Sequence, residues 1–187
     1  MPNFKNKLFI ISGPSGAGKD SVINEVKKFF SIEKIVTTTT RAMRPGEIEG
    51  VDYYFLSEEE FKKRIDEGRF FEWAQQYNDN YYGVTFEEIE RVKQSEAIGL
   101  WNLDYKGTVT IKKLMPEIKS IFITASLDIL EKRIRARDKV TDEFVAERMK
   151  YTKEWLKHQD IYDFVVENNE GKLDEAVAKV LEIIKNN

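Results

Sequence analysis

Gly13-Pro14-Ser15-Gly16-Ala17-Gly18-Lys19-Asp20 is the stretch that decides the fold of this chain of 187 residues. An apolar run over residues 8–12 precedes it, and an amphipathic helix is expected to follow it over residues 21–30. Glycines permit backbone angles at which successive N–H groups turn toward one anion, and the helix start adds its positive dipole end. The stretch therefore predicts a loop that binds a polyphosphate, in which Lys19 places a full charge at the β- and γ-phosphate oxygens.

The residue after the lysine departs from the usual phosphate-loop pattern. A Ser or Thr normally stands there and gives its hydroxyl to Mg²⁺, whereas here Asp20 follows Lys19 and Ser21 comes one residue later. A carboxylate is a good ligand for a hard cation. We hypothesise that Asp20 takes part in a Mg²⁺ site, directly or through water. The alternative is that Asp20 only interacts with the helix dipole.

The composition excludes several classes of protein. The net charge of −3 argues against a general nucleic-acid binder, which needs a basic surface to displace counterions. The chain has no cysteine, and therefore neither a disulfide nor a thiolate metal site. The N-terminal residues resemble no signal peptide, and no apolar run reaches membrane length. We expect a cytoplasmic protein that forms one domain over residues 1–187, with no nucleic-acid or membrane partner; its oligomeric state stays open.

Strand and helix patterns alternate over much of the chain. Apolar strands are expected at residues 8–12, 98–103, 118–124 and 164–166, with helical patterns between them. This alternation is typical of an α/β fold with a parallel sheet. The sequence thus predicts a three-layer α/β/α phosphate-loop core, built from about residues 5–33, 97–127 and 158–187, with a helical lid at about 128–157.

The pattern changes between residues 34 and 96. Short strands rich in aromatic residues and threonine are expected at residues 36–40, 52–55, 70–77 and 81–83. Capping boxes at 57–60 and 85–88 start two helices, and Gly68 is placed to end the first of them. We expect a small, mostly β lobe inserted into the core.

A second candidate phosphate site lies in this lobe. Arg41 and Arg44 are three residues apart in a predicted turn, and guanidinium forks suit the geometry of a phosphate. Thr37 and Tyr53 can add neutral hydrogen bonds. Two phosphate sites in one chain imply transfer of a phosphoryl group between them.

The chain resembles the guanylate kinases over residues 7–184. The matching motifs are the loop at Gly13, Thr39-Thr40-Arg41 with Arg44-Pro45-Gly46-Glu47, Gly50-Val51-Asp52-Tyr53, Phe71-Glu72-Trp73-Ala74, Tyr81-Tyr82-Gly83 and Leu103-Asp104 before Gly107. The resemblance implies that ATP, bound by residues 13–21, donates its γ-phosphoryl group to GMP, and dGMP is an expected second acceptor. It assigns the acceptor phosphate to Thr37, Arg41, Arg44, Tyr53 and Tyr82.

The resemblance assigns the reading of guanine to Glu72. Guanine presents N1–H and a 2-amino group side by side, and a carboxylate accepts from both, whereas adenine offers no such pair of donors. The alternative for Glu72 is an exposed strand residue. Asp104 is expected at the end of a strand, where it either accepts from guanine or holds a Mg²⁺-bound water. The resemblance also points to Asn168 as a contact for adenine.

The catalytic residues that we expect are Lys19, Arg41, Arg133, Arg137 and Arg148, the last three matching the lid of the family. Arg133 and Arg137 lie four residues apart on one helix face, and Arg148 is on the next helix. Closure of such a lid brings positive charge to the γ-phosphoryl group as negative charge spreads over it. The acceptor phosphate is already anionic, so no general base is required.

The chain departs from the guanylate-kinase pattern at further positions. Val84 replaces a Ser or Thr that bonds the guanine oxygen, Asn102 replaces an acidic residue, and Lys106 replaces a Gln. Loss of one hydroxyl weakens base recognition by ~1 kcal/mol or somewhat more.

Two alternative functions stay open. Gly-Lys-Asp-Ser and Tyr-Tyr-Gly-Val also resemble the ribose 1,5-bisphosphate phosphokinases, which is the first alternative. The second is a guanylate-kinase-like binding module without catalysis.

Overall fold

The computed structural model describes residues 7–75, 79–137 and 140–187, with Arg137 described by its backbone alone. The backbone packs into two compact units, one made of Ile32–Trp101 and the other of Leu8–Ser31 with Asn102–Asn187. None of the helices in this described part combines the length and the apolarity that crossing a membrane requires. The last residues of the strand expected at 70–77 and the first residues of the core expected from residue 5 lie outside the described residues.

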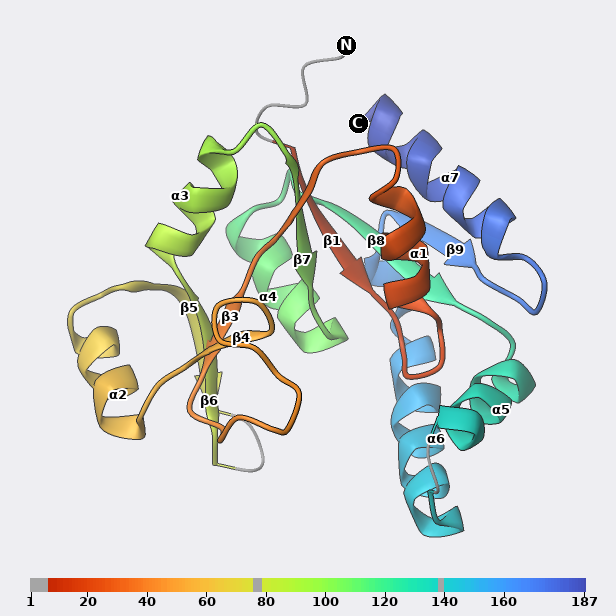
Figure 1. Ribbon diagram of the computed structural model, residues 1–187, viewed down its shortest axis with the longest axis horizontal. Helices are drawn as coiled ribbons and strands as arrows, with labels where there is room; N and C mark the ends of the chain where they lie inside the picture. The colour runs from red at the N-terminus through yellow and green to blue at the C-terminus, as the bar shows by residue number, and fades with distance from the viewer. Residues whose placement is uncertain (1–6, 76–78, 138–139) are drawn as a thin grey trace. The chain divides into compact units, whose positions relative to one another are not determined.

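The unit made of Leu8–Ser31 and Asn102–Asn187 contains parallel strands with helices packed on them. Its strands are β1 (Leu8–Ser12), β8 (Lys119–Thr124) and β9 (Phe164–Glu167). Its helices are α1 (Lys19–Val26), α4 (Tyr105–Leu114), α5 (Leu127–Arg137), α6 (Asp142–Leu156) and α7 (Leu173–Asn186), with a 3₁₀ turn at Gln159–Ile161. Strand β8 pairs with both β1 and β9, so that Ile121 lies opposite Ile11 and Phe122 opposite Val165. Helices α1 and α7 pack side by side (Figure 1).

The unit made of Ile32–Trp101 contains the short strands and two helices. Its elements are β2 (Ile32–Lys34), β3 (Thr37–Thr39), β4 (Tyr53–Phe55), α2 (Glu58–Asp66), β5 (Phe70–Gln75), β6 (Tyr81–Thr85), α3 (Phe86–Gln94) and β7, which ends at the unit boundary (Ile98–Asn102). Strand β3 pairs in parallel with β4 and antiparallel with β6, and β6 pairs antiparallel with β5. Phe61 of α2 is fully buried and stacks on Phe70 at a ring distance of 4.2 Å, which anchors α2.

The structure confirms the expected α/β class. In the described part of the chain, β8 pairs in parallel with β1 and β9 in one unit, β2 pairs in parallel with β7 in the other, and a mixed sheet has the order β4-β3-β6-β5. The side chains of β1 and β8 are almost entirely buried, as expected for a central parallel strand with helices on both faces.

Both capping boxes start helices as predicted. The hydroxyl of Ser57 accepts from the backbone N–H of Glu60, and that of Thr85 accepts from the N–H of Glu88. Gly68 has φ 66° just after α2, which it ends in the left-handed region that glycine tolerates.

Two local predictions were wrong. Helix α1 is Lys19–Val26, so it begins two residues before and ends four residues before the expected 21–30. It begins early because Gly18, at φ 78°, is its N-cap. It ends early because the bonds after Val26 become turn bonds, with Lys28 N–H donating to Glu25 and Phe29 N–H to Val26, and Phe29 is 65% exposed. Strand β2 was missed altogether, since three residues, Ile-Glu-Lys, show no alternation of apolar and polar side chains.

Candidate functional site

The phosphate loop lies between the end of β1 and the start of α1. Gly16 has φ 83°, and a Cβ added to it would stand 2.7 Å from the carbonyl oxygen of Leu130 in α5. A Cβ added to Gly13 would overlap the carbonyl oxygen of Ile123 in β8. The loop therefore packs backbone against backbone on β8 and α5, and only glycine fits at these two positions. This close packing is the observation that makes the loop a suitable polyphosphate cradle.

Asn168 supports the phosphate loop through a hydrogen bond from its side chain. It follows β9, is 3% exposed, and its amide nitrogen donates to the carbonyl oxygen of Ala17 over 2.9 Å. Its own backbone N–H donates to the carbonyl oxygen of Thr124 over 2.7 Å. The structure thus gives Asn168 a supporting role that the sequence did not predict, while its contact with adenine stays a prediction.

Arg133 of α5 also contacts the loop. Its Nη1 donates to the carbonyl oxygens of Gly16 and Asn168 over 3.2 and 2.9 Å. The guanidinium is therefore already fixed beside the loop, where the sequence analysis expects a cation. Arg148 lies on the exposed face of α6, with its guanidinium 5.2 Å from the ring of Phe144. The side chain of Arg137 falls outside the described residues.

Lys19 is placed at the mouth of the loop. Its Nζ donates to the carbonyl oxygen of Gly13 over 2.6 Å, and lies 5.8 Å from the ring centre of Trp155.

Asp20 and Ser21 are exposed in the first turn of α1. Within residues 7–75, 79–137 and 140–187, no three acidic or imidazole side chains gather to hold a metal ion by themselves. One carboxylate and one hydroxyl still fit Mg²⁺, which commonly takes few protein ligands beside phosphates and water.

A buried hydrogen-bonded chain that the sequence did not predict ends beside the loop. The hydroxyl of Ser12, the last residue of β1, donates to the carbonyl oxygen of Leu103 and shares a hydrogen bond of 2.7 Å with the hydroxyl of Tyr162. The indole nitrogen of Trp155 donates to the same Tyr162 oxygen over 3.1 Å. This chain ties the end of α6 to the end of β1, and no local sequence signal connects residues so far apart.

The arginine turn of the other unit is closed by Glu47. Its carboxylate pairs with Arg41 over 2.6 Å and accepts from the backbone N–H of Arg44 over 2.7 Å. The hydrogen bond to Glu47 raises the pKa of Arg41. Hydrogen bonds from Arg41 and from the Arg44 backbone lower the pKa of Glu47 below 4.5. Glu47 thus presets the turn, a role that the sequence analysis did not assign, while the Arg44 side chain stays exposed.

Most of the residues expected to bind the acceptor phosphate lie together around this turn. The Arg41 guanidinium lies 5.3 Å from the ring centre of Tyr53. Thr37 stands beside Tyr53 in the β3–β4 register, and the Tyr53 and Tyr82 rings meet edge to face at 6.3 Å. Burial raises the pKa of Tyr53, so its hydroxyl keeps its proton at neutral pH. This arrangement brings a cation and hydroxyl donors together.

The residues expected at the base differ in exposure. Glu72 and Val84 are cross-strand partners of β5 and β6; Glu72 is half-buried, whereas Val84 is 0% exposed and packs inside the unit. Asn102 is exposed at the end of β7. Asp104 is the N-cap of α4, where one carboxylate oxygen accepts from the N–H of Gly107 over 2.7 Å. This capping role was not predicted from the sequence, and the roles of the four residues at the base stay predictions.

Comparisons with known proteins point to one family. A family model described as "Guanylate kinase" matches residues 5–187. A guanylate kinase of Idiomarina loihiensis is 41% identical over 167 residues, which are 87% of this chain and 79% of that relative. One from Fusobacterium nucleatum is 39% identical and covers 96% of each chain. A crystal structure of guanylate kinase from Anaplasma phagocytophilum is similar with a TM-score of 0.72 at 28% identity, covering 97% of this chain and 86% of that one.

Proposed function

The chain belongs to the guanylate kinase family, and on that premise we propose that it transfers the γ-phosphoryl group of ATP to the phosphate of GMP, giving ADP and GDP. The observation that carries the proposal is the loop at residues 13–18, in which Gly13 and Gly16 pack against backbone atoms and Lys19 stands at the loop mouth. Such a loop presents N–H groups and one cation to a polyphosphate.

The acceptor phosphate is bound in this proposal by the arginine turn. Arg41, Arg44, Thr37, Tyr53 and Tyr82 supply guanidinium and hydroxyl donors to one anion. The pairing of Arg41 with Glu47 supports this role, because a guanidinium held in place loses little entropy when the phosphate arrives.

Glu72 reads the base by accepting from N1–H and the 2-amino group of guanine. Its half-buried place opposite Val84 supports this assignment, since a carboxylate left without those donors penalises the wrong base. We expect dGMP to serve as a second acceptor, because the proposed contacts go to the phosphate and the base rather than to the ribose.

Catalysis consists of positioning and charge neutralisation. Lys19, Arg133, Arg137 and Arg148 neutralise charge that spreads over the transferred phosphoryl group, and Arg41 holds the attacking phosphate in line. Asp20 and Ser21 would hold Mg²⁺, which supplies further neutralisation when bound. The oxygen of the acceptor phosphate forms the new bond to the γ-phosphorus as the bond to the β-phosphate oxygen breaks.

A coupled assay of ADP release tests the choice of acceptor, with GMP, dGMP, AMP and ribose 1,5-bisphosphate supplied separately. We expect turnover with GMP and dGMP, much less with AMP, and loss of turnover in Lys19→Ala. ADP formed only with the ribose compound would falsify the GMP assignment. If no ADP is released with any of the four acceptors, the chain is instead a binding module without catalysis.

A further inference from the structure

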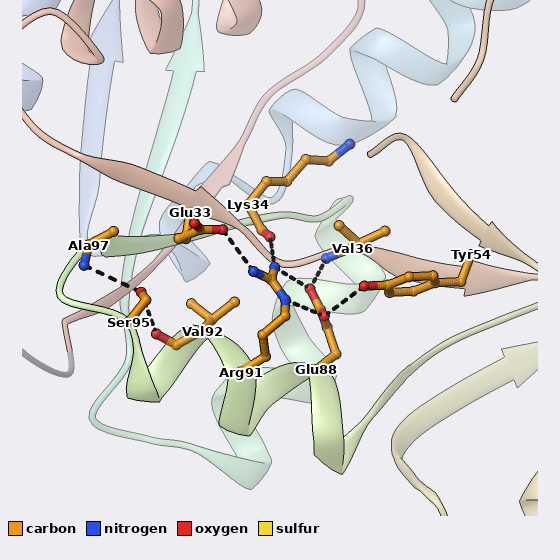
Figure 2. A network of polar contacts seen from close by, with 9 residues as sticks. All are labelled: Glu33, Lys34, Val36, Tyr54, Glu88, Arg91, Val92, Ser95 and Ala97. Atoms are coloured by element: carbon orange, nitrogen blue, oxygen red, sulfur yellow. Dashed lines mark hydrogen bonds and ion pairs between the residues drawn. The ribbon is translucent and has the colours of Figure 1, made fainter. Parts of the chain in front are cut away.

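A buried carboxylate joins three elements in the unit made of Ile32–Trp101. Glu88 lies in the first turn of α3, is 4% exposed, and accepts a hydrogen bond of 2.7 Å from the backbone N–H of Val36 (Figure 2). Its second oxygen accepts from the hydroxyl of Tyr54 over 3.3 Å. Arg91 closes on both oxygens, with its Nε and Nη2 each 2.9 Å away. One side chain thereby holds α3 to β4 and to the residue that precedes β3.

The guanidinium of Arg91 balances the charge of Glu88 and makes further bonds of its own. The Arg91 Nη1 pairs with Glu33 over 2.8 Å, and its Nη2 donates to the carbonyl oxygen of Lys34 over 3.0 Å (Figure 2). The bonds to Glu88, followed by those to Glu33, raise the pKa of Arg91, so the guanidinium stays charged. Glu88 is the buried partner of this ion pair, whereas the Arg91 side chain is 42% exposed. Both Glu88 oxygens accept hydrogen bonds, so moving their donors away leaves a buried carboxylate short of partners, and this fixes the geometry around Glu88.

The two groups that Glu88 holds are immediate neighbours of acceptor residues. Val36 precedes Thr37 at the start of β3, and Tyr54 follows Tyr53 in β4. Thr37 and Tyr53 stand opposite each other in the pairing of these strands. Burial, followed by the nearby Glu88 charge, raises the pKa of Tyr54, so its hydroxyl keeps the proton that it donates.

We infer that Glu88 is a positioning residue for the acceptor phosphate, fixing Thr37 and Tyr53 through the atoms next to each of them. The inference rests on the proposed function, which places a phosphate at those two side chains. Glu88 itself is not proposed to contact substrate. A displacement of either hydroxyl of about 1 Å is enough to weaken binding strongly.

A merely structural role makes a different prediction. A structural ion pair lowers thermal stability when broken and leaves the KM values of the folded enzyme unchanged. A positioning role raises KM for GMP while leaving KM for ATP as it was, because the phosphate loop belongs to the other unit.

Two variants separate these roles. Glu88→Gln keeps an oxygen for Val36 but loses the charge that Arg91 needs, and Tyr54→Phe removes one hydroxyl and nothing else. Glu90→Gln is the matched control, since Glu90 is exposed on the same helix and accepts from Gln94. We expect KM for GMP to rise roughly tenfold in Glu88→Gln and less in Tyr54→Phe, with KM for ATP within about twofold of wild type. Glu90→Gln should match wild type.

Calorimetric titration with GMP alone measures the same effect as Kd and needs no turnover. Unchanged Kd and KM for GMP in a folded Glu88→Gln protein, or an equal rise of both KM values, would overturn the positioning role. If Glu88→Gln does not fold, Tyr54→Phe decides in the same way. A wild-type chain that binds GMP without phosphorylating it contradicts the proposed function but leaves this test intact, whereas one that does not bind GMP overturns both.

Discussion

The amide nitrogen of Asn168 lies 2.9 Å from the carbonyl oxygen of Ala17, although 151 positions separate the two residues in the chain. The hydrogen bond fixes the middle of the phosphate loop to the end of β9. A Cβ added at Gly18 would overlap that same amide nitrogen. The loop, its last glycine and the Asn168 side chain are therefore packed tightly against one another.

Gly18→Ala is expected to raise KM for ATP by more than about tenfold, since the new methyl group displaces Asn168 from the loop. Gly171→Ala is the matched control: Gly171 has φ 72°, close to the 78° of Gly18, and its added Cβ meets no heavy atom of the described chain within 4 Å. Both variants carry a left-handed backbone cost of about 1 kcal/mol. Steady-state kinetics and thermal unfolding measure the two effects. Equal KM values for ATP in the two variants would contradict the packing argument.

Arg133→Ala is expected to lower kcat/KM for ATP by about a hundredfold, because it removes a cation and the bonds to the carbonyl oxygens of Gly16 in the loop and of Asn168. Arg135→Ala, on the same helix, should stay within about twofold of wild type, since exposed ion pairs to Glu131 and Asp142 contribute little. Initial rates with varied ATP measure both. A comparable loss in the two variants would show that helix α5 matters only through its overall charge.

Arg41→Lys is expected to raise KM for GMP by about tenfold or more, because an ammonium cannot hold Glu47 and a phosphate with a planar fork. Arg64→Lys supplies the comparison, as Arg64 pairs with Glu60 on the surface of α2. Kinetics with varied GMP should show no change in that variant. If lysine replaces Arg41 without effect, a point charge is sufficient there and the fork geometry is irrelevant.

The pair of Glu47 and Arg41 gives stability a dependence on pH. The pKa of Glu47 is lower in the folded protein than its ordinary 4.5. The ionised carboxylate therefore contributes fully to the stability of the folded state at pH values above about 4.5. This contribution is lost as the pH falls through the lowered value. The difference in Tm between wild type and Glu47→Gln should therefore shrink between about pH 6 and pH 3. A difference that stays constant over that range would show that the carboxylate is not stabilised by folding.

The sequence predicted the parts of the fold and of the site that short-range patterns encode. The strand, glycine loop and helix around Lys19 follow one another directly, and the capping boxes at Ser57 and Thr85 span only four residues each. Asn168, Tyr162 and Glu88 escaped prediction as supporting residues, because their hydrogen-bond partners come from distant parts of the chain. The early end of α1 escaped for another reason. Phe29 continues the helical spacing of the apolar residues, but the chain forms a turn after Val26 and leaves Phe29 exposed.

Transfer of a label tests the central claim most directly. ATP radiolabelled at its γ-phosphate is incubated with GMP and the wild-type chain, with Lys19→Ala in parallel, and the products are separated by chromatography. The account predicts label in GDP for wild type and almost none for Lys19→Ala. Label found only in inorganic phosphate, or a GDP yield that Lys19→Ala leaves intact, would contradict it.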